Sequence, residues 1–240
     1  MKTNINTTIG TGVSRERAPM SSSRKTALVA GLFYLLTFVS IPTLALYGPV
    51  HDPNYIVGNG PDTAVIIGGI LEIIVALAGI STAVVLYPVV RRQSESAALG
   101  LVAARILESG TIFVGVAFLL SIVALRQAGV GANALVTSQA LATLYDRIFL
   151  LGQSFMPAIC DLLLGLMLYQ SRLVPRGLSL IGIIGAFPLL AGYFAVLFGL
   201  IAQHAPSTAL AAVPVAVFEF SLGIYLVVKG FRPSPLTGGI

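Results

Sequence analysis

The sequence predicts an all-α polytopic membrane protein, built as a bundle of six transmembrane helices. Of its 240 residues, 56% are hydrophobic and only 10% are charged, whereas charged residues make up about 25% of a soluble domain. Helices are expected because backbone amides find no water partner in lipid, and no segment has the alternating pattern of a barrel strand. Six apolar stretches reach the roughly 20 residues needed to cross the hydrocarbon; they are 27–47, 63–90, 97–125, 141–169, 178–202 and 208–228.

We expect three segments along the chain. Residues 1–23 are polar and lack an apolar period, which is typical of a disordered tail. The transmembrane domain then covers 24–232, and 233–240 form a second short tail. The first apolar run has an alternative interpretation as a signal peptide, but its length of about 20 residues exceeds the roughly 7 to 15 of a signal core and favours a retained helix.

The basic residues indicate topology and do not indicate nucleic-acid binding. Although the net charge is +5, these residues flank the apolar stretches and form no patch with interleaved aromatics. Eleven lie in the terminal segments and in the second–third and fourth–fifth connections, whereas the other connections contain only Arg126. The positive-inside rule therefore predicts that both termini are cytoplasmic.

Four charged residues lie near the middle of the apolar stretches: Glu72, Arg105, Glu108 and Glu219. A charge at the centre of a transmembrane helix costs about 3 kcal/mol, so four unpaired charges would cost on the order of 12 kcal/mol. That cost is comparable with the whole stability of a typical domain. We therefore expect the four side chains to be paired, protonated or hydrated.

Helical spacing predicts that these charges face the inside of the bundle. Glu72 and Glu219 each share a helical stripe with small residues, and small residues let transmembrane helices approach closely. Arg105 and Glu108 are three residues apart and can pair along one helix. The stripes consist of Gly68, Ala76, Gly79 and Ala83 on the second span, and Ala212, Ala216 and Gly223 on the sixth.

The fourth span adds a further polar stripe, and it contains a proline. If the helix is regular, Asp146, Gln153 and Asp161 share one face, with Arg147 beside it. Pro157 offers no N–H to the carbonyl of Gln153, so a kink is expected there. The sequence thus predicts one buried polar network composed of Glu72, Arg105, Glu108, Asp146, Arg147, Gln153, Asp161 and Glu219.

Acids outnumber bases in this network by five to two. Either some carboxyl groups are protonated, or the interior holds water or a bound cation. Three interpretations follow: a fixed network that specifies helix packing, which we favour, proton or cation handling, and recognition of a polar ligand with Arg105 as the anion anchor.

Other chemistry has little support in the sequence. There is no H-E-x-x-H motif, phosphate-binding loop or Ser/His/Asp arrangement, so we expect no enzyme, no catalytic residue, no cofactor and no metal. His51 and His204 fall in outer loops, where we interpret them as solvated; a weaker alternative joins them to Asp52 and Asp62 in a metal site. Cys160 is interpreted as a structural thiol.

Three segments resemble a bacterial family of six-span membrane proteins described only as a domain of unknown function. They are AGLFYLLTFVSIP in the first span, AARILE at 103–108 and FEFSLGIYLVVKGFRP near the carboxyl end. The resemblance covers about 20–235 and implies a multi-pass protein of the bacterial plasma membrane, without implying an activity.

The predicted function follows from the residues alone. We expect a non-enzymatic structural or accessory membrane protein with a buried charge network; the alternative is a proton- or cation-linked transporter of a small solute. The expected partner is the lipid bilayer. A small solute, a proton, a cation or a second copy of the chain are left open as further partners, and nucleic acid is not expected.

Overall fold

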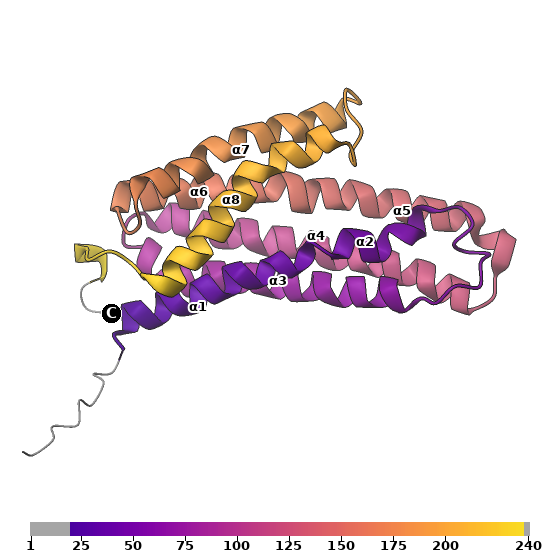
Figure 1. The fold of residues 1–240 in the computed structure, drawn as a ribbon, viewed down its shortest axis with the longest axis horizontal. Helices are drawn as coiled ribbons and strands as arrows, with labels where there is room; N and C mark the ends of the chain where they lie inside the picture. Colours follow the sequence, from indigo (N-terminus) through magenta and orange to yellow (C-terminus); the bar gives the residue numbers. More distant parts are fainter. Residues whose placement is uncertain (1–19, 238–240) are drawn as a thin grey trace, which may run out of the picture.

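The computed structural model describes residues 20–237, which form helices and connections and contain no strand (Figure 1). Six helical segments are long and apolar enough to cross a membrane, so the predicted fold class is confirmed. They span Ser22–His51, Thr63–Val90, Glu95–Gln127, Gly131–Ser171, Arg176–Leu197 and Pro206–Val228.

Four spans are single helices, and two are interrupted. The single helices are α3 (Thr63–Val90), α4 (Glu95–Gln127), α7 (Arg176–Leu197) and α8 (Pro206–Val228). The first span consists of α1 (Ser22–Thr37), η1 (Phe38–Ser40), α2 (Thr43–Tyr47) and η2 (Gly48–His51). The fourth consists of η3 (Gly131–Ala134), α5 (Leu135–Leu150), η4 (Leu151–Phe155) and α6 (Met156–Ser171), and η5 (Pro235–Thr237) lies near the carboxyl end.

Proline accounts for both interruptions. The first span breaks at Ile41 and Pro42, between η1 and α2, because proline cannot donate the hydrogen bond that would continue the helix. In the fourth span η4 is a single π-helical turn that ends just before Pro157. The carbonyl of Gln153 lies inside this turn, at the position where the sequence predicts a kink.

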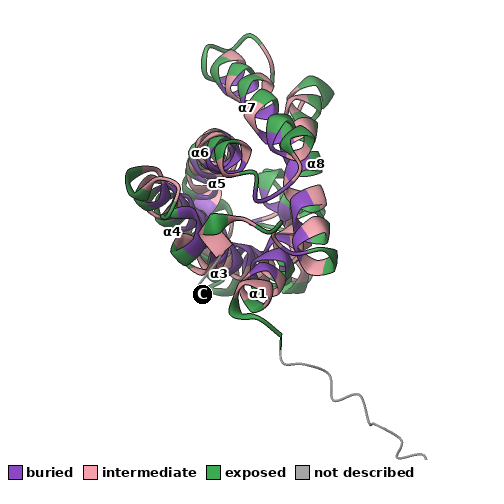
Figure 2. Ribbon diagram, turned by 90° about the vertical axis from the view of Figure 1, so that its left-hand side faces the viewer, coloured by how far each residue is buried: buried purple, intermediate pink, exposed green. Residues whose placement is uncertain are grey.

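The six spans form a closed ring. Each span packs against its neighbours along the chain, and α8 packs against α1, which closes the ring; α4 also contacts α6. Viewed from the end of the bundle, the buried residues lie on the inward faces of the helices (Figure 2). Polar side chains on these faces therefore point toward a common interior.

Close approach of α1 and α8 depends on glycine. A Cβ atom added at Gly31 would lie 2.7 Å from the carbonyl oxygen of Gly223, and one added at Gly223 would lie 3.0 Å from Leu35 Cδ2. Gly31 and Gly223 thus lie in a packing face between α1 and α8. Gly79 differs, since a Cβ there would lie 3.7 Å from Ser109 Oγ, an ordinary contact.

The end of the bundle that carries both termini is tightly packed. The start of α1 lies beside the carboxyl-terminal segment there (Figure 1), and Arg24 donates hydrogen bonds to the carbonyls of Leu226, at 2.9 Å, and Val227. Large side chains are fully buried in the core of this half, among them Tyr34, Leu101, Leu164, Phe218 and Leu222.

At the opposite end, an ion pair fixes the loop between the first two spans. Arg126 Nη1 donates to Asp62 Oδ1 at 2.8 Å, and Arg126 also donates to the carbonyl of Gly58. Burial raises the pKa of Asp62, but the hydrogen bonds from Tyr55 and Gln127 and the charge of Arg126 outweigh burial and hold that pKa below its ordinary value.

Several predicted boundaries differ from the structure, and two of the differences have a clear local cause. Residues 22 and 23, assigned to the amino-terminal tail, belong to α1, whose first turn is capped by the Ser21 hydroxyl. The rest of that predicted tail up to residue 19, and 238–240 of the second tail, lie outside the described residues. The fifth span ends at Leu197 and not at 202, because Gly199 adopts φ +71° and the Leu200 amide bonds back to the carbonyl of Ala195, as in a glycine-terminated helix.

We predict that Gly31→Ala destabilises the bundle, because the added Cβ meets the backbone of α8, which cannot move aside locally. Overpacking of this kind typically costs about 1–3 kcal/mol. Gly110→Ala is the matched control, since Gly110 is exposed and its Cβ would meet nothing within 4 Å. Thermal unfolding in detergent should show a lower midpoint for Gly31→Ala only; equal midpoints for the two variants would contradict close α1–α8 packing.

Candidate functional site

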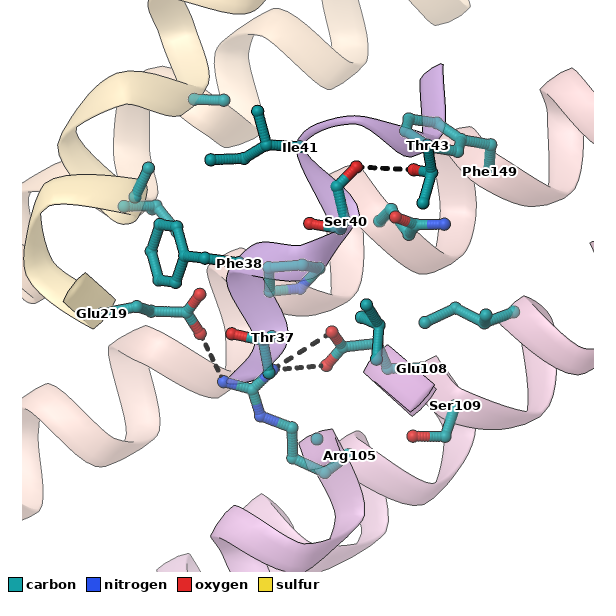
Figure 3. A pocket seen from close by; sticks show the side chains of 18 of the residues that line it. Thr37, Phe38, Ser40, Ile41, Thr43, Arg105, Glu108, Ser109, Phe149 and Glu219 are labelled. Atoms are coloured by element: carbon teal, nitrogen blue, oxygen red, sulfur yellow. Dashed lines mark hydrogen bonds and ion pairs between the residues drawn. The ribbon is translucent and has the colours of Figure 1, made fainter. Parts of the chain in front are cut away.

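Arg105 lies at the centre of a buried charge cluster. Its Nη1 donates to both carboxylate oxygens of Glu108 at 3.1 Å, and its Nη2 donates to Glu219 Oε1 at 2.5 Å. Figure 3 shows the guanidinium between these two carboxylates. The Arg105 side chain is only 4% exposed, so the contacts form in a medium where charge pairs interact far more strongly than in water.

Asp161, on α6, adds a third carboxylate. Its Oδ1 lies 3.9 Å from Arg105 Nη2, its side chain is 0% exposed, and neither of its oxygens has a hydrogen-bond partner among residues 20–237. Three carboxylates thus surround one guanidinium, and full ionisation of all four groups would leave a net charge of −2. Burial of that charge is costly, so charge balance requires protons on the carboxyl groups or an additional cation.

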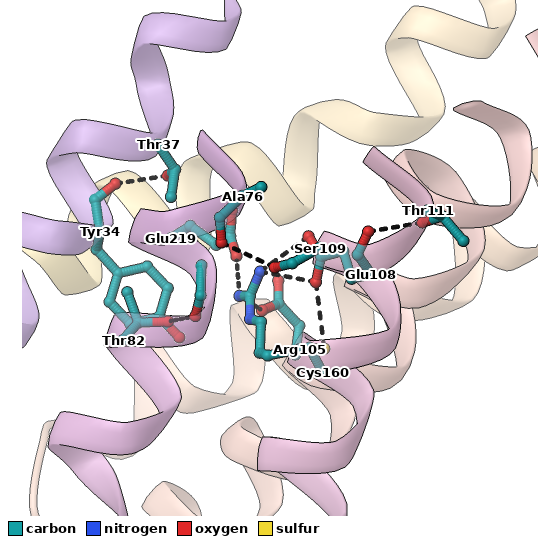
Figure 4. Close-up of polar contacts among 12 residues, drawn as sticks. Tyr34, Thr37, Ala76, Thr82, Arg105, Glu108, Ser109, Thr111, Cys160 and Glu219 are labelled. Carbon is teal, nitrogen blue, oxygen red and sulfur yellow. Dashed lines mark hydrogen bonds and ion pairs between the residues drawn. The ribbon is translucent and has the colours of Figure 1, made fainter. Parts of the chain in front are cut away.

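Neighbouring side chains hold the cluster in place. The guanidinium carbon of Arg105 lies 5.8 Å from the centroid of the Tyr34 ring, within the range of a cation–π contact. Cys160 Sγ donates to Glu108 Oε2 at 3.5 Å (Figure 4). Tyr34 lies on α1, and the charged residues lie on α4 (Arg105 and Glu108), α6 (Asp161) and α8 (Glu219). Side chains from four spans therefore meet in this cluster.

Glu72 lies in a separate polar site. Gln153 Nε2 donates to Glu72 Oε2 at 2.6 Å, and the hydroxyls of Thr43 and Tyr47 donate to Glu72 Oε1 at 2.9 and 3.5 Å. None of these partners is cationic. The two interruptions supply the donors, because Thr43 starts α2 after the proline break and Gln153 lies in the π-helical turn; π-helical turns are frequent at functional sites.

Two cavities extend from the charge cluster toward the end of the bundle opposite the termini. The inner cavity, of about 360 Å³, is lined by Arg105, Glu108 and Glu219. The outer cavity, of about 700 Å³, is lined by His51 and His204. Both are lined by Phe149, Gln153, Leu189 and Ala212.

The sharing of four lining residues makes the two cavities adjacent. Together they lead from the outer loops inward to the cluster. On the other side of the cluster lies the buried core of Tyr34, Leu101 and Phe218. The cavities therefore lie on the outer-loop side of the cluster, and a packed core fills its other side.

Two of the predicted network residues do not join the interior. Arg147 is exposed, and Asp146, which is half-buried on α5, faces His51, whose Nε2 is 3.0 Å from Asp146 Oδ1. The predicted stripe assumed an uninterrupted α-helix. The π-helical turn between Leu150 and Met156 changes the helical phase, so residues before it are rotated relative to Asp161.

The sequence interpretation also missed several contacts. Tyr34 and Thr43 are uncharged and gave no signal in an apolar helix, although both contact buried charges. His51 and His204 do not meet Asp52 or Asp62; the Asp52 carboxylate accepts the amide of Asn54, and Asp62 pairs with Arg126. Their carboxylate neighbour is Asp146.

The fold and the site define a six-span membrane protein with a buried charge cluster beside two adjacent cavities. Comparison with known families identifies the family of the chain. Residues 29–230 match the model of the family described as Domain of unknown function (DUF4386), and the chain belongs to that family. The resemblance seen in the sequence is thereby confirmed. No curated protein and no solved structure matches the chain.

We predict that Arg105→Ala strongly destabilises the protein, because it leaves Glu108, Glu219 and Asp161 without their shared cation. Removal of one partner of a buried pair typically costs about 3–5 kcal/mol. Arg147→Ala serves as the control, since this exposed arginine also lies within the fourth span. Folded yield and melting midpoint in detergent are the measurements. If Arg105→Ala melted at the wild-type temperature, the guanidinium could not be the group that balances the cluster.

Proposed function

We propose that this protein is a proton- or cation-linked transporter of a small solute, with the Arg105 cluster as the proton or cation site. The observation that carries the proposal is the pair of adjacent cavities that lead from the outer loops to the surplus carboxylates. Ionisable residues inside a membrane commonly mark ion and substrate pathways, and a cavity gives solutes and water access to them.

A purely structural or accessory role is the second candidate. It is favoured by the fixed pairing of Arg105 with Glu108 and Glu219, which ties α4 to α8. A structural role does not explain two features, the cavity beside Glu219 and the carboxyl group of Asp161, which has no hydrogen-bond partner among residues 20–237. For this reason we place transport first; neither candidate involves catalysis.

The proposal includes an orientation in a bacterial plasma membrane. Eleven basic residues flank the spans on the side of the termini, against Arg126 alone in the other connections, which favours cytoplasmic termini. The cavities then open to the outside and the tightly packed half faces the cytoplasm. Such an arrangement corresponds to one of the two states of an alternating-access cycle.

We predict that the carboxyl group of Glu219 is required for proton movement. Protein reconstituted into liposomes that contain a pH-sensitive dye should take up or release protons when Na⁺, K⁺, guanidinium or tetramethylammonium is added. None of these cations carries a proton through the lipid at neutral pH, because Na⁺, K⁺ and tetramethylammonium have no proton to lose and guanidinium is too weak an acid to lose one. Glu219→Gln keeps the shape of the side chain but cannot ionise, so it should reduce the signal at least tenfold.

Glu95→Gln is the matched control, because Glu95 is an exposed acid in the first turn of α4. It should retain the wild-type signal. A folded wild type that moves no protons with any of these cations would exclude proton-coupled movement of these cations. A Glu219→Gln variant as active as wild type would contradict the assignment of the Arg105 cluster as the coupling site.

A further inference from the structure

Three side chains from distant parts of the chain meet beside the connection between α7 and α8. His51 ends η2, Asp146 lies on α5, and His204 lies in the connection between α7 and α8. We refer to His51, Asp146 and His204 as the outer triad. The proposed transport function does not use these residues, and the sequence contains no other histidine.

The distances within the outer triad fit a metal ion. His51 Nε2 lies 3.0 Å and His204 Nε2 3.7 Å from Asp146 Oδ1, and one ligand atom from each residue lies within 4.8 Å of the others. Zinc binds histidine nitrogen and carboxylate oxygen at about 2.0–2.2 Å in tetrahedral geometry, which sets neighbouring ligand atoms ~3.3 Å apart. Movements of a few tenths of an ångström would bring the two measured pairs to that spacing.

The surroundings of the outer triad also suit a metal ion. The other ring nitrogen of His51, Nδ1, lies 3.3 Å from the carbonyl of Gly48, the kind of second contact that fixes the ring of a metal-binding histidine. Gln203 Nε2 donates to the Asp146 carbonyl at 3.0 Å, next to His204 in the same connection. The ligands are therefore held by neighbouring backbone and are partly preorganised.

Access from solvent is available. The side chains of His51 and Asp146 are 31% and 20% exposed, and that of His204 is 59% exposed. His51 and His204 line the outer cavity, so a bound ion would have protein ligands on one side and the cavity on the other. Sites with three protein ligands keep a fourth position for water or another small molecule.

We propose that the outer triad is a binding site for a divalent transition-metal ion of the zinc class, located at the mouth of the outer cavity. Imidazole nitrogen prefers Zn²⁺, Cu²⁺ and Ni²⁺, whereas Mg²⁺ and Ca²⁺ prefer oxygen ligands. The ion would connect the end of the first span and α5 to the α7–α8 connection. The site stands independently of the transport proposal, and its test measures binding alone.

The test is Zn²⁺ binding to the full-length protein in detergent, measured by isothermal titration calorimetry after purification through a tag without histidine. One Zn²⁺ per chain should bind, and Mg²⁺ or Ca²⁺ should give no saturable signal. His204→Ala and Asp146→Asn should each weaken Zn²⁺ binding at least tenfold, since even loss of an outer-shell contact costs about 10- to 100-fold in affinity. His204 is exposed, so its replacement leaves the fold intact.

Asp52→Asn is the control, because Asp52 is an exposed outer acid adjacent to His51 that takes no part in the triad. It should bind Zn²⁺ as wild type does. Co²⁺ provides an independent readout, because a site with two imidazoles and a carboxylate gives visible ligand-field absorption that His204→Ala should abolish. Absence of Zn²⁺ binding to folded wild type, or equal affinity in His204→Ala and Asp52→Asn, would overturn the proposal.

Discussion

The packing of the bundle interior depends on the ion pairs that the Arg105 guanidinium makes with buried carboxylates. The guanidinium bonds to Glu108 on its own helix and to Glu219 on α8, and it lies beside Asp161 on α6 and Tyr34 on α1. No element of this cluster is stable alone in a membrane, because each isolated charge would be expensive there. The contacts therefore link the packing of four spans to the charge state of one site.

The cluster contains more carboxyl groups than one guanidinium can neutralise. A single guanidinium neutralises one carboxylate, so the remaining two acquire protons or a cation, and the Asp161 carboxyl group has no other hydrogen-bond partner among the described residues. The inner cavity reaches Glu108 and Glu219, whereas the buried core seals the other side. Changes in protonation at these groups can therefore be exchanged with the cavity and can affect the helices that the pairs hold together.

Much of this architecture was predictable from the sequence, because it depends on the properties of single helices and of residues close together in the chain. The six apolar stretches follow from the thickness of the hydrocarbon, and the pairing of Arg105 with Glu108 follows from their helical spacing. Inward orientation of Glu219 followed from the small residues on its stripe. The ring closure between α1 and α8 was not predictable, since apolar helix faces resemble one another.

The sequence-based predictions of the charged site were wrong where a helix is not a regular α-helix. The π-helical turn places Asp146 and Asp161 on different faces and brings Gln153 to Glu72. The position of such a turn cannot be predicted from the periodicity of hydrophobic residues. Pro157 indicated a distortion but not its form. The meeting of His51 and His204 with Asp146 depends on how two loops pack over α5, and that packing is a tertiary property.

The central claim, that an open path leads from the outside to the charge cluster, is tested most directly by thiol accessibility. A cysteine at Ala212, which lines both cavities, is placed in a Cys160→Ser background, where the hydroxyl can replace the thiol as donor to Glu108. The account predicts that this cysteine reacts with a membrane-impermeant thiol reagent added to intact cells, while one at lipid-facing Ile184, 63% exposed on the surface of the bundle, does not. An unreactive cysteine at position 212 in a folded protein would contradict it.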